Sequence, residues 1–469
     1  MFNRNLKKSP SNPETSTELK RDLANRHIQL IAIGGCIGTG LFMGSGKSIA
    51  ASGPAILIVY SVIGVMLYFM MRAMGELLLS DLRYRSFADC AEDLLGPFAG
   101  FATGWSYWLA WIITAMAELI AVSGYVAFWW PEIPPWVPVP IALLGLIAAN
   151  LMTVRLFGEF EFWFAMIKIL AILALIVVGI VLISSHHTAE LGTPAAVSNL
   201  WTQGGIFPTG WPGVTVGFAT AIFAFVGMEI VGTTAAEVKN PERVLPSAIN
   251  AIPTRILMFY VGSLAILMMV TPWQIIPSNS SPFVAMFNES GFKASASFVN
   301  FIALTSALSS INSGLYSTSR MLFGLSTRGN APGLFSRVSP RGVPFPALLF
   351  GGSLLLVPAW VLALGARMMD AFQWVACGAS LLFLLIWTLI MLSYFAYRKR
   401  HPDRHKSSAF QLPWGISTAI CVLLFFSFIL WTLQRDPEVG NILWALPAWL
   451  MLMILWYWLR NRSPGPASS

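Results

Sequence analysis

The chain has 469 residues, of which 56% are hydrophobic and 11% are charged, and its formal net charge at pH 7 is +8. Soluble domains contain about 25% charged residues, so this chain has too few polar side chains to cover its own surface, and lipid must surround much of it. The lysines and arginines lie between apolar segments, which is typical of a membrane topology signal and argues against a nucleic-acid partner.

Apolar segments long enough to cross a bilayer follow one another along the whole chain. A transmembrane helix needs about 20 mainly apolar residues. We therefore predict an all-α integral membrane protein with about twelve transmembrane helices in a domain at 26–462, between polar tails at 1–25 and 463–469. The predicted spans are 28–47, 54–80, 98–128, 138–155, 158–184, 212–236, 251–277, 297–326, 345–365, 370–397, 413–433 and 440–460.

The positions of the basic residues predict the orientation in the membrane. An even number of spans places both ends of the chain on one side. That side would carry 24 of the 29 lysines and arginines, and the opposite side would carry Lys47, Lys293, Arg367 and Arg435. By the positive-inside rule both termini are predicted to be cytoplasmic. Segment 82–95 is then predicted to be a short amphipathic cytoplasmic helix, and 278–296 an outer loop in which a short helix closes over a cavity.

The first span contains an unusual run of glycines. Four of the seven residues from Gly34 to Gly40 are glycine, and each glycine in a helix interior costs about 1 kcal/mol relative to alanine. Two interpretations are open at this point. The small residues allow close packing of helices, or the helix is interrupted here and offers free backbone groups to a ligand.

The sixth span favours the second interpretation. Residues 223–234 are again interrupted by glycine at mid-depth, and Glu229 follows Gly227 by two positions. Because the sixth span comes five spans after the first, an inverted five-helix repeat would bring the two interruptions together, which is where such transporters bind substrate. Free N–H groups at the start of a half-helix suit a carboxylate, and free carbonyl groups suit an ammonium. The pattern therefore predicts a site for a zwitterionic amino acid.

Three charged residues fall near the middle of predicted spans. Lys168, Glu118 and Glu229 each lie in apolar surroundings, where an ionisable side chain is costly and usually functional. A desolvated lysine loses its proton readily, so we interpret all three as candidate proton-coupling residues. The alternative is a structural salt bridge between Lys168 and Glu118 or Glu229. Arg72 and Glu76, one turn apart at the end of the second span, are predicted to be an ordinary structural pair.

These segments carry a resemblance to a known family. The stretches NRHIQLIAIGGCIGTGLFMGSGK, MRAMGELLLSDLRYRSFADCAEDLLGP, FGEFEFWFAMIKI, FAFVGMEIVGTTAAEVKNPERVLPSAIN and NSGLYSTSRMLFGL are similar to amino acid permeases of the amino acid–polyamine–organocation superfamily. The resemblance covers about residues 20–460. It implies the LeuT-like inverted repeat with broken helices 1 and 6, in a multi-pass protein of a bacterial inner membrane. It also implies proton-coupled import of small neutral amino acids by alternating access: glycine, D-alanine, D-serine and L-alanine.

The resemblance also implies roles for individual residues. The N–H groups of Thr39 and Gly40 would bind the carboxylate, and the carbonyl groups of Cys36, Phe223 and Val226 the ammonium. Ala224 and Gly227 would complete this substrate site, Phe223 would form an aromatic lid, and Lys168 would match the proton-linked lysine of the family. Weaker candidates for the side-chain pocket are Glu118, Ser309, Asn312, Ser313 and Cys377.

Other functions stay open to different degrees. Ala117-Glu118-Leu119 is more similar to the aromatic permeases, so a broad or aromatic permease, or an exchanger, is the nearest rival. A sensor or channel is the rival of another class, although the sequence has neither a large soluble output domain nor a repeated filter-like loop. The sequence contains no nucleophile–base set that would indicate an enzyme. The four cysteines and five histidines do not have the spacing of metal ligands. The expected partners are thus an amino acid, protons and lipid, with no cofactor; the sequence leaves the oligomeric state open.

Overall fold

The computed structural model describes residues 37–84, 86–151, 154–188, 193–233, 240–289, 293–436 and 439–462. Cys36, the inner part of the first predicted span and both predicted tails lie outside these residues.

The described part of the chain is helical and includes ten helices that are long and apolar enough to cross a membrane. This confirms an all-helical protein with many spans. The ten helices are Gly44–Ser80, Pro97–Ala127, Phe162–Ser184, Gly210–Thr233, Pro241–Val270, Ala294–Thr327, Phe345–Ala363, Met368–Arg400, Ile416–Arg435 and Gly440–Asn461.

Two predicted spans account for the difference between ten and about twelve. The fourth span forms α7 (Pro138–Asn150), a helix of 13 residues that is too short to count among the ten. The first span is described only from Ile37 onward, as α2 (Thr39–Phe42) and α3 (Gly44–Ser52), and α3 leads through a 3-10 turn into α4 (Ile56–Ser80).

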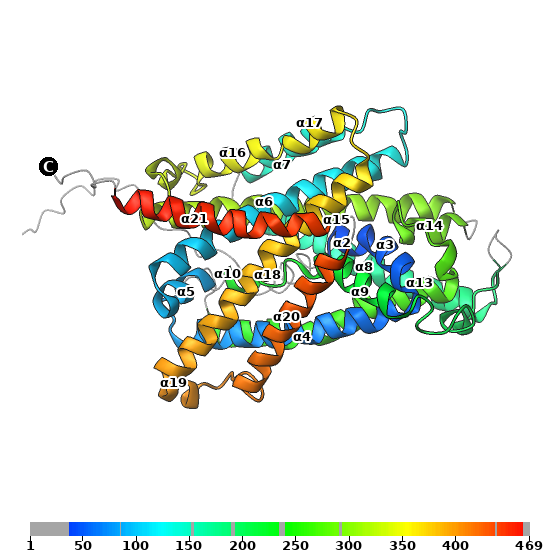
Figure 1. Cartoon of the computed structure of the whole chain (residues 1–469). Helices are drawn as coiled ribbons and strands as arrows, with labels where there is room; N and C mark the ends of the chain where they lie inside the picture. Colours follow the sequence, from blue (N-terminus) through cyan, green and yellow to red (C-terminus); the bar gives the residue numbers. More distant parts are fainter. Residues whose placement is uncertain are drawn as a thin grey trace, which may run out of the picture.

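Three long helices form the centre of the molecule. These are α6 (Pro97–Ala127), α15 (Lys293–Thr327) and α18 (Met368–Arg400), and α6 packs against both of the others. In Figure 1, α15 runs alongside α6 while α18 crosses the bundle diagonally. The fully buried rings of Tyr107 and Trp111 on α6 meet Phe383 of α18 edge-on, at 6.3 and 5.9 Å between ring centroids. This core positions the side chains of α6 that face the two interrupted spans.

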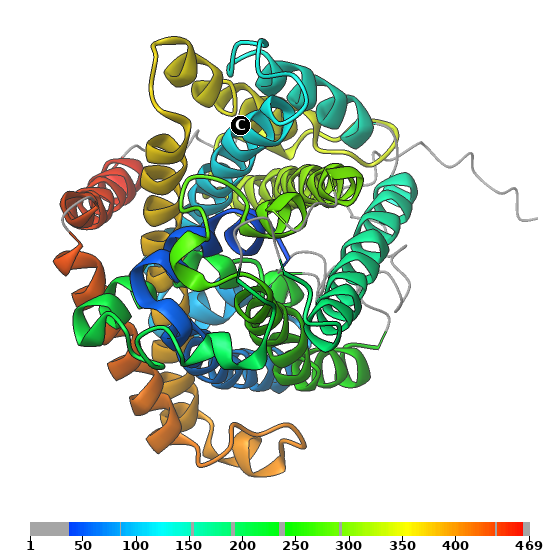
Figure 2. The same cartoon turned by 90° about the vertical axis from the view of Figure 1, so that its right-hand side faces the viewer.

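Other helices present apolar side chains to the outside. α21 (Ala445–Arg462) lies at the edge of the bundle (Figure 2), and Leu452, Ile454 and Leu455 on it are all more than half exposed. α8 (Val154–Ser184) likewise exposes Leu170 and Val177. Such surfaces are stable only against lipid or another apolar partner, as expected of a multi-pass membrane protein.

Two half-helices of the first and sixth spans pack very closely. The Ser52 hydroxyl of α3 donates to the Gly213 carbonyl of α9 (Gly210–Ala221) at 2.9 Å. Nearby, the hydroxyl groups of Ser48 and Thr220 are also 2.9 Å apart. A Cβ atom on Gly217 would lie 1.9 Å from Ser52 Oγ. Close packing through small residues thus operates between these two half-helices.

The two predicted short helices are present. Segment 82–95 forms α5 (Phe87–Leu95), which buries Phe87 and Leu94, and its Asp89 forms an ion pair with Arg328 near the end of α15. Segment 278–296 forms α14 (Pro282–Glu289). In Figure 1, α5 and α19 (Pro402–Ser407) lie at one end of the bundle, and α3 and α14 lie at the other.

The predicted pair of Arg72 and Glu76 is wrong. Glu76 lies 2.5 Å from His405 Nδ1 and accepts the Leu412 N–H at 2.7 Å. Arg72 donates to Asn250 Oδ1 at 2.9 Å, and its guanidinium stacks on a ring of the same 401–412 connector. Both side chains therefore hold that connector against the end of α4. Buried backbone groups of the connector need hydrogen-bond partners, and a salt bridge between Arg72 and Glu76 would leave those groups without them.

The seventh span is displaced along the sequence from its predicted range of 251–277. The helical run covers Pro241–Val270, including α11 (Pro241–Asn250), a π-helical stretch and α13 (Ser263–Val270). Pro241 starts the run because proline is favoured in the first turn of a helix. The run ends just before Pro272, which restricts the preceding residue to extended backbone.

Candidate functional site

The sixth span leaves α-helical geometry near its middle. α9 ends at Ala221, a 3-10 turn covers Ile222–Phe225, Val226 is extended with φ −60° and ψ 138°, and helix resumes with α10 (Ile230–Thr233). Gly227 has φ of +101°. That backbone region is readily adopted only by glycine, so the glycine at this position permits the interruption.

The described part of the first span begins as a half-helix. Gly38 is extended, with φ −118° and ψ −164°, and α2 starts at the next residue. The first N–H groups of any helix have no partner within it and carry the positive end of the helix dipole. In α2 the Thr39 N–H points to a carboxylate oxygen, Oε1 of Glu118, at 3.4 Å.

The two interrupted spans touch through their backbones. A Cβ atom on Gly40 would lie 2.6 Å from the Cα atom of Ala224 and 3.2 Å from the carbonyl carbon of Phe223. The Ala224 carbonyl group accepts a hydrogen bond from the Tyr260 hydroxyl at 2.9 Å. The structure therefore places Thr39, Gly40, Phe223 and Ala224 together, although they are far apart in the sequence.

A small gap lies where these backbones meet α6 and α15. Its volume is about 10 Å³, which is room for about one water molecule. Hereafter we call it the central gap. Its lining consists of Gly38, Gly40, Trp111, Thr114, Glu118, Phe223, Ala224, Val226 and Ser310.

The Glu118 side chain lies at the N-terminal end of α2. Its side chain is buried, Oε1 accepts the Thr39 N–H, and Oε2 has no hydrogen-bond partner among the described residues. A Cβ atom on Gly38 would come within 2.7 Å of Oε1. A carboxylate of the protein itself thus occupies the position that suits an anion.

Glu229 closes the interruption of the sixth span from the other side. It is completely buried, and its Oε2 accepts the Gly227 N–H at 3.2 Å. The side chains of Trp111 and Trp387 lie beside this carboxyl group. Within the described ranges Glu229 Oε1 and both indole N–H groups have no hydrogen-bond partner. Glu229 thus satisfies one backbone group of the break through Oε2, and its second oxygen faces the other way.

Lys168 is fully buried in α8, and its charge acts on Glu118. The sequence left open whether Lys168 pairs with Glu118 or with Glu229. The electrostatic interaction of the Lys168 ammonium is with Glu118.

The four weaker pocket candidates have different surroundings. The Asn312 amide oxygen accepts from Asn150 of α7 at 2.7 Å, so this side chain faces the fourth span. Ser313 is buried with no hydrogen-bond partner for Oγ among the described residues, and Ser309 and Cys377 are also buried. None of the four lines the central gap, and their role in selecting side chains stays a prediction.

Sequence reasoning assigned no site role to four residues of the gap: Gly38, which belongs to the glycine run of the first span, and Trp111, Thr114 and Ser310. Trp111 and Thr114 lie seven and four residues before Glu118 on α6, and this spacing places all three on one face of the helix. That periodicity was the available signal. Ser310 lies in a run rich in serine, where small polar residues cover every face and the orientation of the helix is not readable from the sequence.

Comparisons with known proteins agree on one family. The family model described as "Amino acid permease" matches residues 27–463. The D-serine/D-alanine/glycine transporter of Escherichia coli K12 is 49% identical over 445 residues, covering 95% of each chain. The amino-acid permease AapA of Bacillus subtilis is 46% identical and covers 95% of this chain and 96% of its own. The aromatic amino acid transport protein AroP of Escherichia coli O6:H1 is 40% identical over 95% and 97% of the two chains.

Proposed function

The chain belongs to the amino acid permease family, and from this premise we propose that it imports small neutral amino acids together with protons by alternating access. As a family member it is a multi-pass amino acid transporter and not an enzyme. The observation that carries the proposal is the central gap, where the backbones of two interrupted spans meet beside a buried carboxylate.

The gap supports a binding mode for a zwitterion. The substrate carboxylate takes the N–H groups of Thr39 and Gly40 at the start of α2, where the helix dipole favours an anion. The ammonium takes the carbonyl groups of Phe223 and Val226, together with that of Cys36, which lies outside the described residues. Ala224 and Gly227 shape the backbone around it. The Phe223 carbonyl group already accepts the Val226 N–H at 3.2 Å, and its second lone pair would serve the ammonium.

The walls of the gap support small substrates. Trp111, Thr114 and Phe223 surround a space of about 10 Å³, so the molecule must open slightly even for glycine. The energetic cost of opening rises with the size of the substrate side chain. We therefore propose glycine, D-alanine, D-serine and L-alanine as substrates, in line with the relatives named for the first three.

The position of Glu118 supports coupling to protons. A substrate carboxylate can take the Thr39 N–H only if the Glu118 carboxylate leaves it. Two carboxylates at one helix start repel each other, and a proton on Glu118 removes that repulsion. In this mechanism the proton that enters with the substrate resides on Glu118, and Lys168, which no longer faces a negative charge, gives up its own proton more readily and passes it on. Glu229 is proposed as a second proton site at the opposite side of the break.

The remaining features of the proposal concern the whole chain. We propose one transport domain at 26–462 with twelve spans, an inverted five-helix repeat that pairs spans 1 and 6, and cytoplasmic tails at 1–25 and 463–469. The clustering of arginine and lysine at the α5 and α19 end supports cytoplasmic termini. The bacterial relatives support a bacterial inner membrane.

One observation favours a second candidate function. AroP, named for aromatic amino acids, is 40% identical over almost the whole chain, and a broad or aromatic permease or an exchanger would use the same backbone site. A channel is less favoured because the central gap has room for only about one water molecule.

A competition assay in proteoliposomes distinguishes the two candidates. We expect a tenfold excess of unlabelled D-serine or D-alanine to suppress uptake of labelled glycine by about tenfold, whereas phenylalanine and lysine at the same excess leave it nearly unchanged. Suppression by phenylalanine alone would assign the chain to the aromatic permeases.

A further inference from the structure

We propose that Tyr260 is a positioning residue for the ammonium end of the substrate, because it fixes the backbone turn of the sixth span whose carbonyl groups would hold that ammonium. Tyr260 lies in the π-helical stretch Ile256–Gly262 of the seventh span, behind the wall of the central gap. The inference rests on the proposed function, since it concerns the same site.

The Tyr260 hydroxyl group bonds directly to the wall of the central gap. It donates to the Ala224 carbonyl group at 2.9 Å, and Ala224 is one of the residues that line the gap. Ala224 lies in the 3-10 turn Ile222–Phe225. If that turn continued, its carbonyl group would accept the Gly227 N–H, but this N–H donates to Glu229 Oε2 at 3.2 Å. Tyr260 therefore gives the carbonyl group a partner at the point where helical bonding stops.

Two aromatic contacts hold the Tyr260 ring in place. The ring stacks on Phe225, with 5.0 Å between the ring centroids and 15° between the ring planes. Tyr60 of α4 lies against both rings, at 5.9 Å from Tyr260 and 5.4 Å from Phe225. All three side chains are buried. Because close packing leaves buried rings little room to move, the hydroxyl group stays directed at the Ala224 carbonyl group.

The backbone that carries Tyr260 is itself held firmly. π-helical turns are rare and occur frequently at functional sites. This stretch packs closely on α4, where a Cβ atom on Gly64 would lie 2.7 Å from Ile256 Cγ2. At its other end the Ser263 hydroxyl group donates to the Tyr260 carbonyl group at 3.2 Å. Both contacts fix the part of the seventh span that reaches the interruption.

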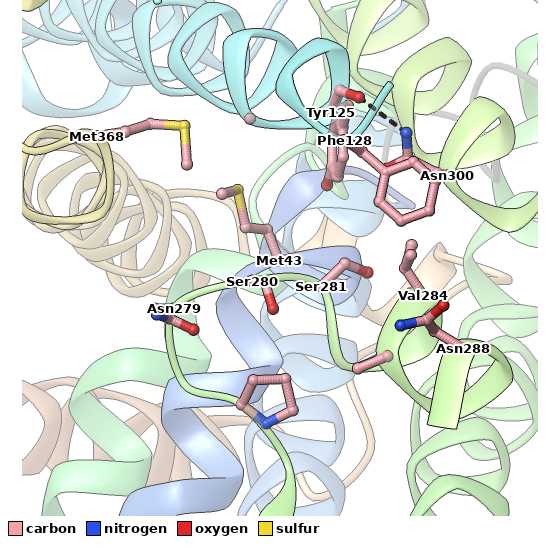
Figure 3. Close-up of a pocket in the computed structure, with 13 residues that line it drawn as sticks. Met43, Tyr125, Phe128, Asn279, Ser280, Ser281, Val284, Asn288, Asn300 and Met368 are labelled. Carbon is pink, nitrogen blue, oxygen red and sulfur yellow. Dashed lines mark hydrogen bonds between the residues drawn. The ribbon is translucent and has the colours of Figure 1, made fainter. Parts of the chain in front are cut away.

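The two walls of the central gap have different surroundings. A cavity of about 370 Å³ lies beside the first span, and Met43 forms part of its lining (Figure 3). None of the lining residues in the described part of the chain belongs to the sixth or seventh span. The first span therefore has free space next to it, whereas Ala224 is packed against Gly40 and bonded to Tyr260. When the gap opens for a substrate, we expect the first span to move and the sixth to keep its carbonyl groups in position.

The Ala224 carbonyl group lies between the two carbonyl groups that would hold the ammonium, those of Phe223 and Val226. Because each peptide unit is planar, fixing this one restricts the orientation of its neighbours. Without the Tyr260 hydroxyl group, a buried carbonyl group would lose a partner and the turn would rotate to find another. The ammonium contacts would then weaken, while the carboxylate contacts at the start of α2 would stay as they are.

A binding measurement with Tyr260→Phe tests the proposal, because this change removes the hydroxyl group and keeps the ring stack. The probes are labelled glycine and N-methylglycine, which has the same carboxylate and one ammonium N–H fewer, on the purified full-length chain in lipid nanodiscs. The affinity for glycine should fall by about three- to tenfold, the loss expected for one hydrogen bond. The affinity for N-methylglycine should fall less, because a looser turn no longer penalises the methyl group.

Tyr60→Phe is the matched control. It removes a hydroxyl group from the same aromatic cluster, one that has no hydrogen-bond partner among the described residues, and it should leave both affinities unchanged. An unchanged glycine affinity in Tyr260→Phe, or an equal loss for both probes, would overturn the positioning role and leave the proposed function standing. A wild-type chain that binds no small neutral amino acid would overturn both.

Transport in proteoliposomes provides a second measurement. In Tyr260→Phe the KM for glycine should rise while kcat, per chain in the membrane, stays within about twofold of the wild type, as expected when binding alone is weakened. A lower kcat at an unchanged KM would indicate a general loss of function and would contradict the positioning role.

Discussion

At the scale of single residues, Glu118 occupies the place that the mechanism assigns to the substrate carboxylate. Its Oε1 accepts the Thr39 N–H at the start of α2, and the charge of Lys168 acts on it. In the proposed mechanism these two residues decide whether the site is empty or holds both substrate and proton.

Glu118→Gln separates substrate binding from proton uptake. Because substrate and proton enter together in the wild type, the affinity for glycine should fall as the pH rises. Glutamine has the same shape as glutamate without the charge, so the affinity of the variant for glycine should be nearly independent of pH. At alkaline pH the variant should bind glycine about tenfold more tightly than the wild type. Calorimetric titration with glycine at several pH values measures this. An equally steep pH dependence in both proteins would exclude Glu118 as the coupled group.

Lys168→Gln tests the other member of this pair. Uptake driven by an imposed pH gradient should be lost, while exchange of internal for external glycine should remain, because exchange needs no net movement of protons. Lys399→Gln, which changes an exposed lysine at the end of α18, is the matched control and should behave as the wild type. Full gradient-driven accumulation by the Lys168 variant would contradict its proposed role.

At the scale of elements, the interruption of the sixth span depends on one backbone conformation. Gly227 has φ of +101°, and Gly40 packs against the backbone of Ala224. These two glycines serve different purposes: the first permits the turn, and the second permits the contact.

Leucine at either glycine should abolish transport while the protein remains in the membrane. At Gly227 a side chain strains the left-handed backbone, and at Gly40 it would collide with backbone atoms of the sixth span. Gly145→Leu on α7 is a suitable control, because this glycine has no atom within 4 Å of an added Cβ. Uptake of labelled glycine, normalised to the protein in the membrane fraction, measures the effect. Normal uptake by both variants would show that the site lies elsewhere.

The hydrophobicity and glycine content of the sequence predicted the positions of many helices. The ranges 98–128, 297–326 and 370–397 correspond to α6, α15 and α18 within a few residues, because long apolar runs have few alternative folds in lipid. The short helices α5 and α14 were likewise predicted from their polarity. Helix ends were less predictable where proline starts or stops a helix, as at Pro241.

Contacts between distant elements were not predictable in the same way. The sequence singled out Glu118 and Thr39 separately, but it contains no signal that one accepts the N–H of the other. Glu76 likewise bonds to a connector more than 300 residues away, although Arg72 is only one turn from it. Periodicity describes a helix and its faces, whereas these pairs depend on how helices are arranged around one another.

At the scale of the whole molecule, the central gap lies where two interrupted spans meet inside a bundle of long buried helices. In the proposed mechanism the central gap holds the substrate through backbone groups when a proton arrives. Lipid-facing helices such as α21 surround this bundle.

Simultaneous recording of glycine uptake and internal pH in proteoliposomes tests the central claim most directly. With a glycine gradient and no imposed pH gradient, the account predicts that glycine entry acidifies the interior, at a rate proportional to uptake and abolished in Lys168→Gln. Glycine entry at the full rate without any change in internal pH would contradict proton-coupled import.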